Sequence, residues 1–178
     1  GMVNVPINDR IAVRIIEQYN KRDGFAKSTL TGAELNAEDV NYIRGSILVR
    51  LADSWDLHVS LDNTYSENEG QWLALIGATA AGNTSVGLLS GGTATFSQYV
   101  NPTATRLATQ TTGPNISQNW GAAATLSGTI GSVNLKSITS FRRMSRSLRN
   151  FDQAQTPYTV FQFDNKSRQH QISQELQL

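Results

Sequence analysis

Six stretches of this 178-residue chain alternate apolar and polar side chains with a period of two. Such a period places successive side chains on opposite faces of a β-strand, whereas the apolar positions of a helix recur every three or four residues. The clearest case is residues 57–65, where four apolar side chains alternate with polar ones. The pattern predicts an all-β fold of about six strands, which span residues 10–20, 42–51, 57–65, 120–130, 133–143 and 171–178.

The connections between these stretches fall into two length classes. Residues 52–56 and the dipeptide Gly131-Ser132 are short, and the dipeptide suits a hairpin turn. The other three connections, at about 21–41, 66–119 and 145–168, are long. In an antiparallel up-and-down meander, alternate connections lie at opposite ends, so all the long loops share one end. Outer-membrane barrels have this asymmetry, with short periplasmic turns and long extracellular loops.

The longest connection, residues 66–119, is rich in Gly, Ala, Ser, Thr and Asn. A segment of this length without regular structure is unusual in a compact domain and suggests either a functional loop or a mobile one. We interpret it as a loop of the extracellular type, with a short helix around residues 71–76.

Composition removes several classes of function. Fifteen basic and fourteen acidic residues give a net charge of +1, which provides no electrostatic surface for nucleic acid. There is no cysteine, and neither His58 nor His170 has a second ligand at metal-binding spacing. No nucleophile elbow or phosphate-binding loop occurs. We therefore expect no catalytic, cofactor or metal site, and no enzyme activity. No run of eighteen apolar residues predicts a transmembrane helix.

Aromatic residues are placed toward the ends of the predicted strands. On the apolar faces they lie toward the long loops, while one tryptophan lies in a short turn at the opposite end. Two aromatic belts of this kind border the lipid-facing band of membrane barrels, although aromatic residues also favour strands in general. The candidate girdle residues are Tyr19, Tyr65, Trp120 and Phe141 at the loop end, and Trp55 at the turn end.

The polar faces of the predicted strands carry charged side chains. A charged residue that faces lipid at mid-bilayer costs roughly 2 to 4 kcal/mol, so the charged face of a membrane wall must be the wet one. These side chains could contact a domain that plugs the barrel, or they could line a substrate path. We favour the simpler interpretation that they pair with one another in the barrel wall and contact no ligand. The candidate lumen-facing residues are Arg14, Arg44, Arg50, His58, Asp62, Lys136, Arg142 and Glu175.

Three sequence motifs resemble TonB-dependent outer-membrane receptors. Residues 133–143, VNLKSITSFRR, and residues 171–178, QISQELQL, are similar to two consecutive barrel strands of that family, joined by a loop containing Asp and Pro. Residues 19–25, YNKRDGF, followed by Thr31-Gly32 and Arg44, resemble its early-barrel pattern. The likeness covers most of the chain apart from the long middle loop.

The resemblance implies a segment of a 22-stranded transmembrane β-barrel in the cell outer membrane of a Gram-negative bacterium. Residues 2–178 would be the N-terminal part of the barrel domain, without the plug through which such receptors engage the TonB complex. Expected partners of the parent receptor are outer-membrane lipid, the TonB complex and a scarce nutrient such as a ferric siderophore, imported in iron uptake; cobalamin and carbohydrates are other options. The chain would not transport alone, and in isolation we expect it to roll up or to self-associate through its unpaired edge strands.

A soluble all-β module that binds a ligand or glycan is the alternative. Its turn lengths should not segregate by end, and its aromatic residues should cluster as a platform. The sequence favours the barrel on both counts.

Overall fold

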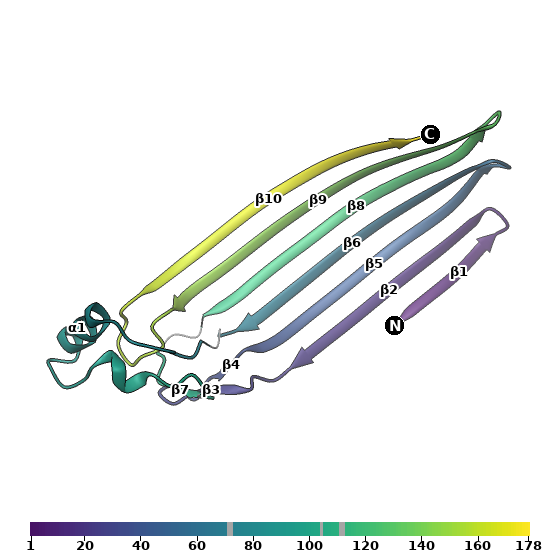
Figure 1. The fold of residues 1–178 in the computed structure, drawn as a ribbon. Helices are drawn as coiled ribbons and strands as arrows, with labels where there is room; N and C mark the ends of the chain where they lie inside the picture. The colour runs from purple at the N-terminus through teal and green to yellow at the C-terminus, as the bar shows by residue number, and fades with distance from the viewer. Residues whose placement is uncertain (71–72, 104, 111–112) are drawn as a thin grey trace.

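The computed structural model describes residues 1–70, 73–103, 105–110 and 113–178, and its main feature is one antiparallel sheet of seven strands (Figure 1). Neighbouring strands of this sheet follow one another in chain order, so the sheet is an up-and-down meander. The predicted all-β antiparallel meander is confirmed. The strands are β1 (Met2–Asn8), β2 (Ile11–Arg22), β5 (Ala37–Ala52), β6 (Trp55–Glu69), β8 (Pro114–Ile130), β9 (Val133–Asp152) and β10 (Gln162–Gln177).

Strand β1 was not among the predicted strands, and it forms one edge of the sheet. It pairs with β2 through Val3 opposite Ile15 and Val5 opposite Val13. Val3, Val5 and Ile7 alternate with Asn4, Pro6 and Asn8. The proline argues against a central strand, but an edge strand tolerates it because one side of its backbone has no partner in the sheet. The other six strands lie where they were predicted and extend further into the polar connections.

Short and long connections lie at opposite ends of the sheet (Figure 1). The turn end carries the hairpins between β1 and β2, β5 and β6, and β8 and β9, two of which turn through Asp53-Ser54 and Gly131-Ser132. The loop end carries the three long connections. This distribution confirms the predicted asymmetry of loop lengths.

The loop end contains the small structured core of the protein. Three short strands form a second sheet in the order β4-β3-β7, and Ala26, Leu35 and Leu107 from these strands form a buried cluster. Helix α1 packs against the 3-10 helix η1. The bounds of these elements are β3 (Ala26–Ser28), β4 (Glu34–Leu35), β7 (Arg106–Leu107), α1 (Ala80–Leu89) and η1 (Phe96–Tyr99).

The helix predicted around residues 71–76 is not present at that place. Residues 73–76 are not helical, and residues 71–72 lie outside the described part of the chain. The helix α1 begins later, after Thr79, whose Oγ1 accepts a hydrogen bond from the backbone N–H of Gly82 at 3.1 Å. Threonine is a favoured residue at this position because it satisfies a free N–H of the first helical turn.

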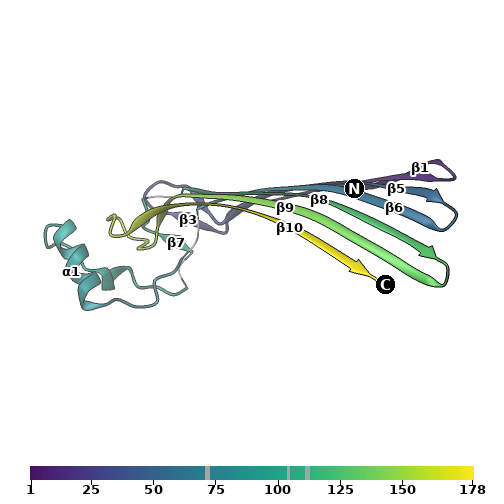
Figure 2. The same ribbon diagram turned by 90° about the horizontal axis from the view of Figure 1, so that it is seen from above.

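The main sheet is a single curved layer that is not rolled up (Figure 2). No described helix or strand packs on either face of it, and strands β1 and β10 are its two open edges. Of the two arrangements expected for the isolated chain, the rolled-up one is therefore not adopted, and self-association through the open edges stays a prediction. The apolar face of the sheet is left open because the loops fold at one end of the sheet instead of over it.

Candidate functional site

The register of the sheet assigns every strand residue to one of two faces. Residues that lie opposite one another on neighbouring strands form rows, and all members of a row point to the same side. One row on the side that we call the polar face joins Arg14, Ser46 and Ser60. The pairings place all eight candidate lumen-facing residues on this face: Arg14, Arg44, Arg50, His58, Asp62, Lys136, Arg142 and Glu175.

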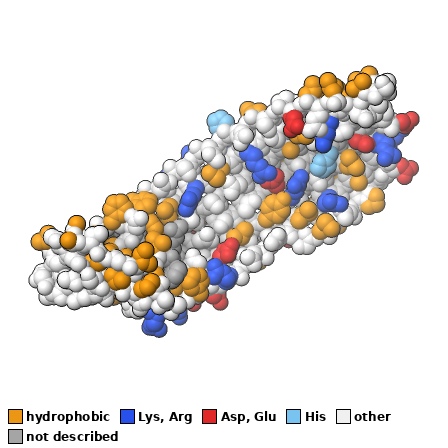
Figure 3. Space-filling model, in the orientation of Figure 1, with side chains coloured by type: hydrophobic (Ala, Val, Ile, Leu, Met, Phe, Trp, Pro, Cys, Tyr) orange, Lys and Arg blue, Asp and Glu red, His pale blue; other side chains and the backbone are white. Residues whose placement is uncertain are grey.

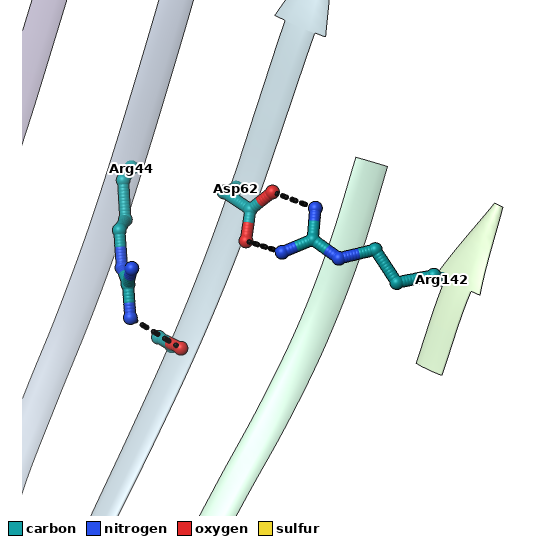
Figure 4. A network of polar contacts seen from close by, with 4 residues as sticks. Arg44, Asp62 and Arg142 are labelled. Atoms are coloured by element: carbon teal, nitrogen blue, oxygen red, sulfur yellow. Dashed lines mark hydrogen bonds and ion pairs between the residues drawn. The ribbon is translucent and has the colours of Figure 1, made fainter. Parts of the chain in front are cut away.

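An ion pair crosses the middle of the polar face (Figure 4). Arg142 of β9 donates two hydrogen bonds to the Asp62 carboxylate on β6, at 2.6 and 3.1 Å. Strand β8 runs between them and contributes Gly121 to the same row. A Cβ atom at Gly121 would lie 3.0 Å from Cζ of Arg142, so the absence of a side chain leaves room for the guanidinium to cross.

The other charges of the polar face form smaller contacts and do not converge on one site. Arg50 and Asp56 lie 3.7 Å apart. Arg44 donates to Ser60 Oγ at 3.2 Å (Figure 4), and Arg14 donates through Nε to Asn4 Oδ1 at 2.6 Å. Of the four arginines in the predicted set, Arg50 and Arg142 are ion-paired, whereas Arg14 and Arg44 have neutral partners.

Two shallow hollows on the sheet take in different members of the predicted set. One, of about 430 Å³, is lined by Arg14 and His58 together with Leu48. The other, of about 510 Å³ at the turn end, is lined by Lys136 with Asp56. The geometry brings together Asp62 and Arg142, and it leaves the remaining candidates spread along the strands.

The opposite side, which we call the apolar face, exposes large hydrophobic side chains. One of its rows crosses all seven strands, and four of its members are more than half exposed: Val3 at 59%, Ile15 at 52%, Leu61 at 60% and Ile172 at 72%. Monomeric soluble proteins rarely expose a continuous apolar patch that extends across a whole sheet. A further group of hydrophobic side chains gathers over the loop end beside α1, whereas charged side chains of both signs are distributed along the strands (Figure 3).

Aromatic residues border the apolar face at both ends. Tyr19 and Tyr65 lie in one row at the loop end, and Trp120 and Phe141 occupy the next two rows inward. The rings of Trp120 and Phe141 are in contact, with centroids 5.0 Å apart. The tyrosine hydroxyl groups donate to Asp39 and Glu67 beyond the apolar rows, at 3.2 and 2.8 Å respectively.

Trp55 is the aromatic residue of the turn end. It lies opposite Gly128 of β8, where a Cβ atom would be 2.2 to 2.7 Å from carbons of the indole ring. The indole therefore lies across β8 in the space that this glycine leaves. Trp55 and Tyr65 are ten positions apart on β6, or about 33 Å along the strand, which a tilt of roughly 40° reduces to about 25 Å.

Sequence reasoning missed a buried carboxyl group at the loop end. Asp152 is 2% exposed, and it accepts hydrogen bonds from the Ala154 N–H at 2.9 Å and from Thr109 Oγ1 at 3.3 Å. Burial raises the pKa of the Asp152 carboxyl above its ordinary value, against these hydrogen bonds, which lower it. No local signal in the sequence identifies its burial, because Thr109 comes from another loop, 43 positions earlier in the chain.

The described residues contain neither a metal site nor a membrane-spanning helix. No three His, Asp or Glu side chains there lie close enough together to hold a metal ion. No helix among them has the length and the apolar character needed to cross a membrane.

In comparisons with known proteins, no family model matches the chain, and no curated protein or solved structure shows significant similarity to it.

Proposed function

We propose that this chain forms part of the wall of a TonB-dependent receptor in the bacterial outer membrane, and that the parent receptor takes up a scarce nutrient such as a ferric siderophore. In this proposal the apolar face contacts lipid and the polar face contacts the water-filled interior. The motifs in residues 133–143 and 171–178 support the family, and they lie on the adjacent strands β9 and β10.

The observation that carries the proposal is the exposed apolar face between two aromatic borders. With the strand tilt usual for outer-membrane barrels, the roughly 33 Å between Trp55 and Tyr65 along β6 would give a height of about 25 Å, which is the height of the apolar band on such barrels. The tyrosine hydroxyl groups are directed away from that band toward acidic side chains. This is the disposition expected of amphipathic rings at a membrane interface.

The lengths of the connections indicate which end of the sheet would face the periplasm. Short turns would face the periplasm, and the structured loop end would face the cell exterior. The charged residues of the polar face would then line the interior, and the exposed Arg142 side chain would face its water. The alternative of a soluble ligand- or glycan-binding module requires a partner to cover the apolar face, and the described chain provides none.

The absence of cysteine allows a direct test by cysteine scanning of β6. Single variants at positions 57 to 62 would be labelled with an environment-sensitive fluorophore after the chain is refolded into phosphatidylcholine vesicles. There, copies of the chain would pair through the open edges β1 and β10, because unpaired backbone groups are not tolerated in the hydrocarbon core. We expect labels at Leu57, Val59 and Leu61 to be quenched by a lipid-borne quencher, because these residues share the apolar face. Labels at His58, Ser60 and Asp62 should respond only to an aqueous quencher.

A result without this period of two would contradict the proposal. Quenching by the aqueous reagent at all six positions, with the chain remaining in solution as a monomer, would favour the soluble module instead.

A further inference from the structure

Basic side chains gather on the apolar face of β9 and β10, next to the aromatic border of the loop end. His170 lies opposite Arg143 in the row of Trp120. The following two rows toward the loop end contain Arg168 opposite Ser145, and Lys166 opposite Ser147. We call Arg143, Lys166 and Arg168 the basic patch.

The basic patch lies immediately beyond the apolar rows. The neighbouring row on the turn side contains Phe141 and Ile172, which are apolar. On β10 the change from lipid-like to basic character therefore occurs within two residues, from Ile172 to His170. A patch at this level faces the headgroup layer if the apolar face contacts lipid, as the proposed function states.

The charges of the basic patch are not neutralised by the protein. All three side chains are exposed, and none of them takes part in the ion pairs found within residues 1–70, 73–103, 105–110 and 113–178. Glu67, an acidic residue in the row of Lys166, is three strand spacings away, or about 14 Å. Its carboxylate already accepts a hydrogen bond from Tyr65.

Acidic residues of the same face occupy the other half of the sheet. Glu17, Asp39 and Glu67 lie on β2, β5 and β6 in the rows that hold the basic patch on β9 and β10. Lys21 of β2 lies opposite Asp39 in the row of Lys166. In these rows the β2–β6 half of the border therefore carries three acidic side chains and one lysine, whereas the charged side chains of the β9–β10 half are all basic. An even distribution of interfacial charge would not produce this separation, which points to an anionic partner over β9 and β10.

We propose that the basic patch binds the net anionic, phosphate-bearing headgroup of a membrane lipid at the outer border of the wall. Guanidinium groups bind phosphate oxygens through two parallel hydrogen bonds, and a lysine adds a point charge. From the level of Lys166 to that of Arg143 the patch covers four residue spacings of β10, about 13 Å, which suits a headgroup with more than one anionic group. Trp120 beside Arg143 would pack on the region where the headgroup joins the acyl chains.

The inference rests on the proposed function, and its test separates the two. The 178-residue chain would be refolded into phosphatidylcholine vesicles that contain traces of spin-labelled phosphatidylglycerol or spin-labelled phosphatidylcholine. Electron paramagnetic resonance then gives the amount of lipid held at the protein surface and the preference between the two headgroups. The patch variant carries Arg143→Gln, Lys166→Gln and Arg168→Gln. A control variant carries Arg14→Gln, Lys136→Gln and Arg146→Gln, which remove the same charge from the polar face.

We expect the unmodified chain to prefer phosphatidylglycerol by at least about fivefold, the factor that one interfacial cation provides. The patch variant should hold as much lipid in total but lose the preference, and the control variant should keep it. If the preference is absent, or if both variants lose it equally, the proposed lipid site is contradicted, whereas the proposal that the chain is part of a membrane wall is not. If the unmodified chain immobilises no lipid at all, the proposed function fails, and the inference fails with it.

Discussion

Arg142 reaches Asp62 across an intervening strand, at 2.6 and 3.1 Å, and it does so above the only glycine in their row. The Asp62 side chain is 8% exposed, whereas that of Arg142 is 57% exposed. The pair therefore joins β6 to β9 in addition to the ladders that each strand forms with β8. A contact of this kind links three neighbouring strands at one row.

A double-mutant cycle with Asp62→Asn and Arg142→Gln should give a coupling free energy of about 1 kcal/mol, the upper end of the range for partly exposed pairs. The reason is the two-point geometry and the low exposure of the carboxylate. The free energy of unfolding would be measured by urea titration of the chain refolded into vesicles. Arg50 and Asp56 provide the comparison, because they are 3.7 Å apart and both more than half exposed. Their coupling should be under about 0.5 kcal/mol, and a value equal to that of Asp62 and Arg142 would contradict this ranking.

Gly121→Val should lower the free energy of unfolding by about 1 to 2 kcal/mol. The new Cβ would meet the Arg142 guanidinium at 3.0 Å and the Phe141 carbonyl oxygen at 3.1 Å, and the second of these belongs to the backbone and cannot swing away. In the Gly121→Val background, Asp62→Asn should then have little further effect. Gly45→Val is the matched control, because nothing lies within 4 Å of its Cβ position and valine favours strands.

The faces of the sheet were predictable from the sequence because register and alternation follow the same period. Once Leu57 and Leu61 are assigned to one side, His58 and Asp62 must lie on the other, and antiparallel pairing carries that assignment from strand to strand. The pairing of Asp62 with Arg142 was not predictable. It depends on the stagger between β6, β8 and β9, which brings together residues 80 positions apart.

The loop end was the least predictable part, for reasons that particular residues show. Gly82 and Gly87 lower the helix propensity of residues 80–89 and conceal α1, although Thr79 before it and Gly91-Gly92 after it are ordinary boundary signals. The small loop sheet depends on contacts such as Ser28 Oγ donating to the Thr109 carbonyl at 2.6 Å. Ser28 and Thr109 are 81 positions apart. Strands of two or three residues that pair with partners so distant in the sequence leave no periodic pattern.

Asp152 should make the loop end more stable in acid. Its carboxyl has a raised pKa in the folded protein, so the folded state binds the proton more tightly than the unfolded chain does. The resulting stability is fully present below the ordinary aspartate pKa of about 4 and is lost as the pH rises through the folded value. The Ala154 N–H donates a hydrogen bond to the Asp152 carboxylate at 2.9 Å, and its hydrogen exchange would measure the local opening free energy across this range. Asp152→Asn keeps an acceptor and should remove the dependence on pH, whereas an unchanged profile would assign it to another group.

Adjacent residues of β8 give the sharpest contrast between the two faces. Ala124 lies opposite Val59 on the apolar face, and Thr125 lies opposite His58 on the polar face. In vesicles, Ala124→Arg should lower the free energy of unfolding by roughly 2 to 4 kcal/mol, because the guanidinium would have to enter lipid near mid-bilayer. Thr125→Arg introduces the same side chain on the wet side and should cost under about 1 kcal/mol. Urea titration of both variants measures the difference. Equal costs would mean that the two faces meet the same solvent, and the wall proposal would then lose its main support.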